Sequence, residues 1–214
     1  MDYGKSFTYM FEEDNWITKF LIGVVVGTIP IINFAAFGYV LEIVKNVRDG
    51  DQQPLPEWDD FGTLFINGLK FLLGTMVYAL PAILISFMFV PFAILAEEAP
   101  GALVGLGITA VTCLVIFFAL LPVLLMPVLM VQFARRDLIG DMFAFGDMWQ
   151  MIKSDIATYL IILLLLFFVM SFIAGIGFLA CGIGVFFSSW YSYLVGGHIT
   201  GQFARQQPGI EKAA

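Results

Sequence analysis

The stretch of sequence that decides the fold runs from residue 156 to residue 204 and reads IATYLIILLLLFFVMSFIAGIGFLACGIGVFFSSWYSYLVGGHITGQFA. Its 49 residues include no Asp, Glu, Lys or Arg, and His198 is its only side chain with an ordinary pKa close to neutrality. Because a transmembrane helix needs about 20 predominantly apolar residues, this stretch has room for two. The glycines between Gly175 and Gly184 indicate a tight turn that separates them.

Three more uncharged stretches precede this one, over residues 20–41, 71–96 and 99–134. Each is long enough for one membrane-spanning helix. We therefore predict an all-α, polytopic membrane protein that forms a single integral membrane domain over residues 1–214. Its expected parts are an N-terminal interfacial segment at 1–19 and about five transmembrane helices, near residues 20–44, 68–95, 103–134, 157–178 and 184–204. Prolines inside these spans are expected to kink them: Pro30, Pro81, Pro91, Pro122 and Pro127.

The composition agrees with this class of protein. Hydrophobic residues make up 60% of the 214 residues and charged residues only 13%, and the mean hydropathy is +0.93. A soluble domain is about 45–50% apolar and about 25% charged. The low charge and high hydrophobicity exclude intrinsic disorder, and two cysteines exclude a disulfide-rich scaffold. A net charge of −7 argues against a nucleic-acid partner, which requires a basic surface.

Lysine and arginine are unevenly distributed over the two sides of the membrane that five spans define. Eight of the ten fall on one side, and only Lys5 and Lys19 fall on the other. Because cytoplasmic loops are enriched in these residues, we expect a multi-pass protein of the cell membrane with a cytoplasmic C-terminus and an external N-terminus. One alternative stays open. If Pro30 and Asn33 mark a re-entrant hairpin instead of a span, the N-terminus is cytoplasmic.

The acidic segment at residues 49–60, DGDQQPLPEWDD, is the most distinctive part of the chain outside the spans. Its two prolines restrict the backbone, and Trp58 suits the headgroup layer of a membrane. Asp59 or Asp60 can cap the helix that follows. We interpret the segment as an elbow at the membrane surface. A cytoplasmic docking surface and an acidic cation site are the alternatives, although the carboxylate spacing does not match a calcium loop.

At this point the sequence resembles a known family. The resemblance rests on Gly38-Tyr39, on the segment LPEWDDFG at residues 55–62 and on NGLK at residues 67–70. These are similar to the pattern of an uncharacterised family of integral membrane proteins from archaea and bacteria, domain of unknown function 4013. The similarity is good over about residues 10–85. It implies an integral membrane protein and supplies neither an activity nor catalytic residues.

Polar residues inside or beside the predicted spans are candidates for function, because they are costly in lipid and usually face other helices or a cavity. His198 is either a neutral imidazole bonded to a neighbouring helix or a relay for protons or substrate. Glu42 and Lys70 could pair across adjacent helices near the membrane boundary. The full set of candidate polar or partner-facing residues comprises Asn33, Tyr39, Glu42, Trp58, Asp59, Asp60, Lys70, Gln132, Arg135, Trp149, His198, Gln202 and Arg205.

Two stretches of the GxxxG form, at residues 23–27 and 197–201, favour close approach of helices. Glycine at both ends of such a stretch leaves one helix face without side chains, so another backbone can lie against it. The first and last helices are therefore expected either to pack together or to form a seam between two copies of the chain.

The sequence contains no glycine-rich phosphate loop with lysine and no HExxH, CxxC or GxSxG motif. A single histidine argues against a zinc site and against an intramembrane enzyme. We therefore predict a non-catalytic membrane protein without cofactor or metal: a scaffold or accessory subunit that binds membrane lipids or a membrane partner. A homo-oligomer or a larger membrane complex is compatible with this function. The alternative is a small permease or exporter of a hydrophobic or amphipathic molecule.

Overall fold

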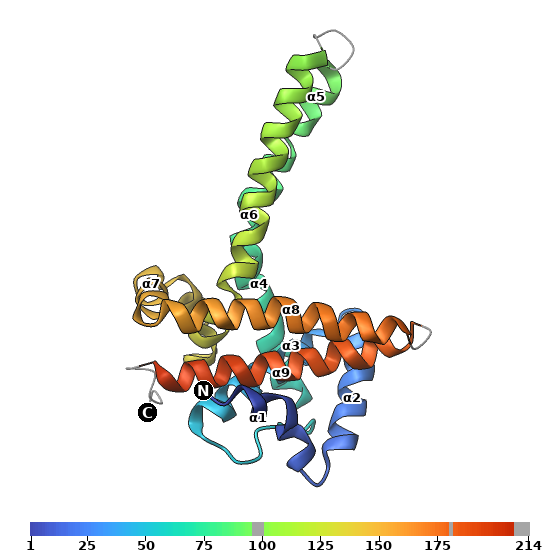
Figure 1. Cartoon of the computed structure of the whole chain (residues 1–214), viewed down its shortest axis with the longest axis vertical. Helices are drawn as coiled ribbons and strands as arrows, with labels where there is room; N and C mark the ends of the chain where they lie inside the picture. Colours follow the sequence, from blue (N-terminus) through green and yellow to red (C-terminus); the bar gives the residue numbers. More distant parts are fainter. Residues whose placement is uncertain (96–100, 180–181, 208–214) are drawn as a thin grey trace. The chain divides into compact units, whose positions relative to one another are not determined.

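The computed structural model describes residues 1–95, 101–179 and 182–207, and all regular elements in these ranges are helices (Figure 1). The chain divides into two compact units, and the single integral membrane domain expected over residues 1–214 stays a prediction. Unit 1 comprises residues 1–72 and 127–214, and unit 2 comprises residues 73–126. The helices are α1 (Tyr3–Thr8), η1 (Tyr9–Glu12), α2 (Trp16–Thr28), α3 (Phe34–Asp49), α4 (Phe61–Ser86), α5 (Phe89–Leu95), α6 (Gly101–Arg136), η2 (Ile139–Phe143), α7 (Phe145–Ser154), α8 (Ile156–Leu179) and α9 (Gly184–Gln206).

Three helical segments of the described chain are long and apolar enough to cross a membrane: Phe61–Ile94, Gly101–Arg136 and Ile156–Phe178. They coincide with three of the five stretches expected to span. Proline does not end the helix in every case, because α6 continues past both Pro122 and Pro127. Helix α9 covers the stretch expected near 184–204 but is not among the three, and it carries several Ser, Gly and Tyr residues.

The stretch at 20–44 differs from the single helix expected there. It consists of α2 and α3, which are separated by residues 29–33 and pack against each other. Pro30 lacks the backbone N–H that a continuing helix needs, and Ile31 has a φ of 73° in the left-handed region. With 13 residues, α2 is shorter than the roughly 20 residues that a transmembrane helix requires.

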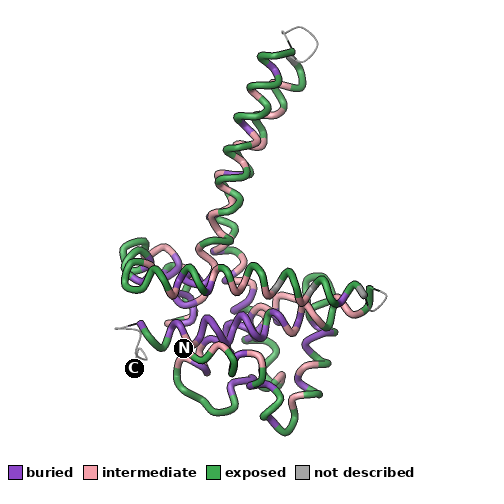
Figure 2. The backbone as a smooth tube through the Cα atoms, in the orientation of Figure 1, coloured by how far each residue is buried: buried purple, intermediate pink, exposed green. Residues whose placement is uncertain are grey.

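Helix α9 is at the centre of unit 1 and packs against α1, α2, α3 and α8. Figure 2 shows a nearly continuous buried stretch along it, and residues 194–201 are all buried. Its two GxxxG glycines lie against α3: a Cβ at Gly197 would lie 3.0 Å from Val40, and one at Gly201 would lie 2.6 Å from Val47. The expected packing of the first and last helical regions is therefore present.

The other GxxxG stretch also lies against α9. A Cβ at Gly23 of α2 would come within 2.2 Å of the Trp190 ring, so the glycine makes room for the indole. Trp190 is only 3% exposed and belongs to the main apolar core of unit 1. Both glycine pairs thus hold neighbouring helices against the central one.

Glycines also allow α3 and the first turns of α4 to cross backbone against backbone. A Cβ at Gly38 would lie 1.8 Å from the carbonyl oxygen of Leu64, and one at Gly68 would lie 1.8 Å from that of Phe34. No side chain fits at either position without moving a helix. The crossing fixes where α4 begins relative to α3, and so it positions the acidic segment between them.

Unit 2 contains the second part of α4, α5 and the first part of α6. Phe92 of α5 packs on Gly107 of α6, where a Cβ would lie 2.1 Å from the ring. Most large apolar side chains of this unit are exposed, as the colouring of Figure 2 shows. This pattern is typical of helices that are surrounded by lipid.

Candidate functional site

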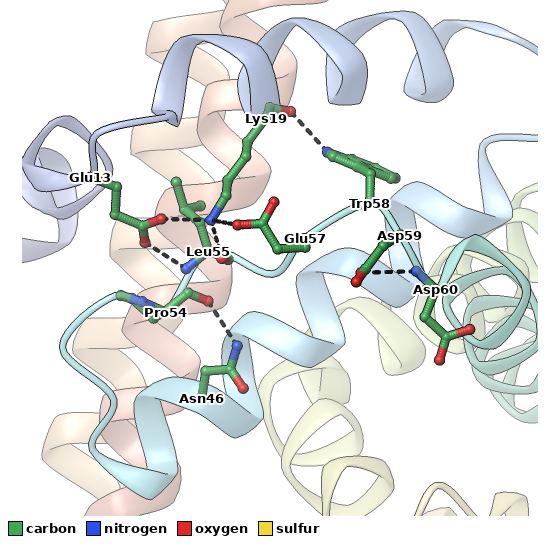
Figure 3. A network of polar contacts seen from close by, with 9 residues as sticks. All are labelled: Glu13, Lys19, Asn46, Pro54, Leu55, Glu57, Trp58, Asp59 and Asp60. Carbon is green, nitrogen blue, oxygen red and sulfur yellow. Dashed lines mark hydrogen bonds and ion pairs between the residues drawn. The ribbon is translucent and has the colours of Figure 1, made fainter.

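The acidic segment at residues 49–60 is anchored by a buried ion cluster that comes from the N-terminal part of the chain (Figure 3). Lys19 Nζ lies 2.9 Å from Glu13 Oε2, 2.9 Å from Glu57 Oε1 and 2.8 Å from the carbonyl oxygen of Leu55. The Lys19 and Glu13 side chains are only 9% and 3% exposed. Burial alone would lower the pKa of Lys19, but its bonds to the two carboxylates raise that pKa above its ordinary value.

Further hydrogen bonds fix the backbone of the segment. The second carboxylate oxygen of Glu13 accepts the Leu55 N–H at 2.8 Å, and the Trp58 indole donates to the Lys19 carbonyl at 3.0 Å. Asn46 of α3 donates to the Pro54 carbonyl at 3.1 Å. The segment is therefore a rigid elbow held from two sides. Glu13 and Lys19 were not among the sequence candidates, because the contacts that join them to the elbow connect residues 36 and 42 positions apart in the chain.

Aromatic rings cover the elbow on its inner side. Trp58 stacks on Tyr39 with ring centroids 4.3 Å apart, and Trp190 lies 5.6 Å from Tyr39. Trp58 is partly buried and packs against the main apolar core of unit 1, and its place in the headgroup layer stays a prediction. The Tyr39 hydroxyl and the Trp190 indole N–H are buried without a hydrogen-bond partner in the described part of the chain. A cavity of about 120 Å³ lies beside Trp190, between α2, α3 and α9, and Asn33 lines it.

The aspartates at the end of the elbow serve the next helix. Asp60 accepts the Thr63 N–H at 3.2 Å and so caps α4, while Asp59 accepts the Asp60 N–H at 3.0 Å. In the described residues no group of three His, Cys, Asp or Glu side chains could hold a metal ion. The structure therefore gives the acidic cation site no support.

Other candidates take part in local contacts. Glu42 pairs with Lys45 at 2.8 Å and not with Lys70, which is half-buried in α4, and Lys45 also pairs with Asp137 at 2.7 Å. One helical turn separates Glu42 from Lys45, so this pair forms within α3. The pair that was considered between Glu42 and Lys70 across helices is not formed.

The candidates around the end of α6 and in α7 lie close together in unit 1. Arg135 pairs with Asp147 at 2.9 Å, and Gln132 donates to the Ala144 carbonyl at 3.5 Å. Trp149 of α7 is 59% exposed and stacks under the Lys153 ammonium, which is 4.7 Å from the ring centroid. These contacts fold η2 and α7 against the end of α6.

The remaining three candidates, His198, Gln202 and Arg205, meet at a polar cavity of about 390 Å³ in unit 1. The cavity lies between α1, the end of α3 with the start of the elbow, and the last turns of α9. Its polar and charged lining includes Asp2, Lys5, Asp51, His198, Gln202 and Arg205. A volume of this size is in the range of small-ligand sites.

His198 is held in place by the N-terminal segment. It is 5% exposed, its Nδ1 lies 2.9 Å from the Ser6 hydroxyl and 3.1 Å from the Gln202 amide nitrogen, and its ring stacks on Tyr9 at 4.2 Å. Burial raises the pKa of Tyr9, whose neutral hydroxyl donates to the Leu194 carbonyl at 3.1 Å. Gln202 is fixed in turn by Asp2, whose N–H donates to its oxygen at 2.6 Å and whose carbonyl accepts from its nitrogen at 2.7 Å.

The sequence pointed to the α9 half of this site and missed the other half. The residues that it missed, Ser6, Tyr9 and Asp51, are almost 150 residues or more away from His198 in the chain. No local pattern marks a contact over such a separation. The only sign was the mixture of aromatic and charged residues in the first 19 positions, which was interpreted as an interfacial segment.

Comparison with known proteins places the chain in a family. The family described as protein of unknown function (DUF4013) matches residues 21–182, which extends well beyond the region of about 10–85 where the resemblance was visible. An uncharacterised protein of Methanocaldococcus jannaschii is 24% identical over 150 residues. That alignment covers 70% of this chain and 52% of the archaeal protein, so the chain spans about half the length of this curated relative. No solved structure matches the chain. With three quarters of its length matched, the chain belongs to the DUF4013 family of proteins of unknown function.

Proposed function

We propose that the chain is a non-catalytic, multi-pass membrane protein, a scaffold or accessory subunit that binds lipids or a membrane partner. One observation carries the proposal: Lys19 and Lys45, whose side chains are only 9% and 15% exposed, are engaged in structural contacts within unit 1. Lys19 is held by two carboxylates and a carbonyl, and Lys45 is held by two carboxylates. Such groups rigidify a surface and are not free to transfer protons or ions.

Contacts between the N-terminal segment and α9 support a topology with both termini in the cytoplasm. Asp2 is bonded to Gln202, one helical turn before Arg205, so the N-terminal segment lies beside the end of α9. In this arrangement α2 and α3 form a re-entrant pair, and four crossings follow, by α4 with α5, by α6, by α8 and by α9. All ten lysines and arginines then lie on the cytoplasmic side, instead of eight of ten. The proposal therefore adopts the re-entrant alternative over the external N-terminus.

Purification in a mild detergent, followed by native mass spectrometry, tests the function. We expect the full chain to retain a stoichiometric lipid or a second protein, because the exposed apolar faces of α2, α4, α6 and α8 need a cover. A second membrane protein of similar size, purified in the same detergent, is the control for non-specific lipid. Repeated recovery of bare monomer contradicts the proposal.

A permease is the second candidate, because the polar cavity reaches His198, although neither Glu42 nor Lys70 lines it. A permease must open its binding site to both sides of the membrane in turn. It therefore predicts that a water-soluble maleimide reaches Ser189→Cys, beside the smaller cavity, from the side opposite the termini. An unreactive cysteine at this position, with normal expression of the variant, counts against transport.

A further inference from the structure

The polar cavity of unit 1 combines a cation and an anion that do not neutralise each other. Arg205 and Asp51 both line it, and both are exposed. Neither side chain has a hydrogen-bond or ion-pair partner among the described residues, and the two are not within 4.0 Å of each other. The other charged lining residues differ: Asp2 accepts the Lys5 N–H at 2.9 Å, and the Lys5 ammonium pairs with Glu12 at 3.5 Å.

The buried histidine presents a hydrogen-bond donor to the same cavity. The Gln202 amide can take only one orientation, because its oxygen accepts the Asp2 N–H and its nitrogen donates to the Asp2 carbonyl. Its NH₂ group therefore faces His198 Nδ1 at 3.1 Å. One hydrogen of this NH₂ group goes to the Asp2 carbonyl, and the other is shared between the Ser6 hydroxyl at 3.0 Å and His198 Nδ1 at 3.1 Å. Because an amide NH₂ only donates, this contact favours the tautomer in which Nδ1 accepts and the proton of the neutral ring is on Nε2.

The Nε2 atom has no hydrogen-bond partner in the described part of the chain. It is also not one of the fully buried polar atoms without a partner, so it keeps some accessible surface. His198 lines the cavity although its side chain is 95% buried. A buried imidazole that lines a cavity, and whose Nε2 has no partner among the described residues, is a group that a ligand can satisfy.

We propose that this cavity binds a small zwitterion that carries an oxyanion and a primary ammonium group, as phosphoethanolamine does. The oxyanion pairs with the Arg205 guanidinium and accepts the His198 Nε2–H, and the ammonium pairs with Asp51. A ligand with only an anionic group leaves Asp51 unpaired beside a second negative charge. A ligand with only a cationic group leaves Arg205 unpaired beside a second positive charge. This inference rests on the proposed function, because the headgroup of a bound phospholipid has this chemistry. A soluble compound has it as well.

A calorimetric titration of the full chain in detergent tests the proposal with phosphoethanolamine, inorganic phosphate and ethanolamine as probes. We expect phosphoethanolamine to bind more tightly than either fragment. Nitrogen NMR of the imidazole reports whether binding occurs at this cavity, since the chain has a single histidine. The free protein should show the Nε2–H tautomer, and phosphoethanolamine should shift its signal. A protonated or Nδ1–H ring, or an unchanged signal at saturation, overturns the proposal.

Two exposed substitutions separate the two charges of the ligand. Arg205→Gln should weaken the binding of phosphoethanolamine and of phosphate at least about tenfold, the loss expected when a charge-assisted hydrogen bond is removed. Asp51→Asn should weaken phosphoethanolamine by a similar factor and leave phosphate unchanged or tighter. Because both side chains are exposed, the melting temperature of each variant should stay that of the parent. Equal loss of both ligands in Asp51→Asn contradicts an ammonium site.

The source of the ligand is decided in nanodiscs that contain equal amounts of phosphatidylethanolamine and phosphatidylglycerol. Preferential retention of phosphatidylethanolamine, lost in Asp51→Asn, assigns the site to a lipid headgroup. Binding of soluble phosphoethanolamine without such retention supports the site and assigns it to a soluble ligand, while the proposed function then depends on another surface. Lipid retention that is equal in the parent and in both variants, together with no binding of soluble phosphoethanolamine, supports the proposed function and overturns this inference.

Discussion

Lys19 illustrates how single charged residues shape this apolar chain. Its ammonium is enclosed by two carboxylates and a carbonyl, and it connects the N-terminal segment to the elbow. Removing one partner of a buried pair leaves the other charge without compensation, which costs more than the pair itself contributes. Glu13 is 4% exposed, so removal of Lys19 leaves a buried carboxyl group without its charged partner.

We therefore expect Lys19→Met to lower the free energy of unfolding by about 3 kcal/mol. The matched control is Lys5→Met, whose pair with Glu12 is about half exposed, and its effect should stay within about 1 kcal/mol. Chemical unfolding in detergent, followed by tryptophan fluorescence, measures both. The double variant Glu13→Gln with Lys19→Met should recover part of the loss, and an additive result contradicts the argument.

At the same scale, the sequence identified the polar residues of α9 but not their partners. His198, Gln202 and Arg205 stood out because polar groups are rare in the uncharged stretch around them. Ser6 lies in polar surroundings, where such residues are common and carry no signal, and Asp51 belongs to the acidic segment at residues 49–60, which was interpreted as an elbow and not as part of this site. Their role follows only from long-range packing.

Helices are placed by glycine contacts as much as by hydropathy. Gly38 lies against the Leu64 carbonyl, and Gly68 lies against the Phe34 carbonyl. Helices α3 and α4 therefore contact each other backbone to backbone. Hydropathy predicted the course of α8 and α9 within two residues at each end. Hydropathy did not predict the two helices at residues 20–44, because a continuous apolar stretch indicates one helix even where Pro30 interrupts it. The alternative hairpin was recognisable only from Pro30 and Asn33.

The α3–α4 crossing predicts different effects for two glycine substitutions. Gly38→Ala should destabilise the protein by about 1–3 kcal/mol or more, because its Cβ meets backbone that cannot turn away. Gly62→Ala, near the start of α4, has no atom within 4 Å of its Cβ and should be neutral or stabilising by less than about 1 kcal/mol. Thermal unfolding in detergent compares the two. Similar melting temperatures for both variants contradict the crossing.

On the scale of the whole molecule, the distribution of cations over five spans favours an external N-terminus, whereas the contacts of the N-terminal segment favour a cytoplasmic one. Counting assumes that each apolar stretch crosses once, whereas the bonds between Asp2 and Gln202 require the N-terminal segment and the end of α9 to be neighbours. The membrane class and the family were predictable from sequence, because they depend on local hydropathy and local motifs. The side of the N-terminus stays a prediction, because it depends on whether one interrupted stretch crosses the membrane.

Single cysteines in a chain without Cys113 and Cys181 test the topology. Asp14→Cys, in the exposed N-terminal segment, should react with an impermeant maleimide in inverted membrane vesicles and stay unlabelled in intact cells. Ala102→Cys, at the start of α6, should show the opposite pattern. Labelling of Asp14→Cys in intact cells places the N-terminus outside and excludes the re-entrant arrangement.

The central position of α9 has a consequence for how the protein is made. Translation runs from the N-terminus, so α9 leaves the ribosome after the helices α1, α2, α3 and α8 that surround it. Until then their inner faces, including Gly23 of α2, which lies against Trp190 of α9, are not covered by their native partner. The core of unit 1 therefore closes in a late step that depends on contacts of very long sequence separation, and such steps are slow and expose the unfinished chain to misassembly.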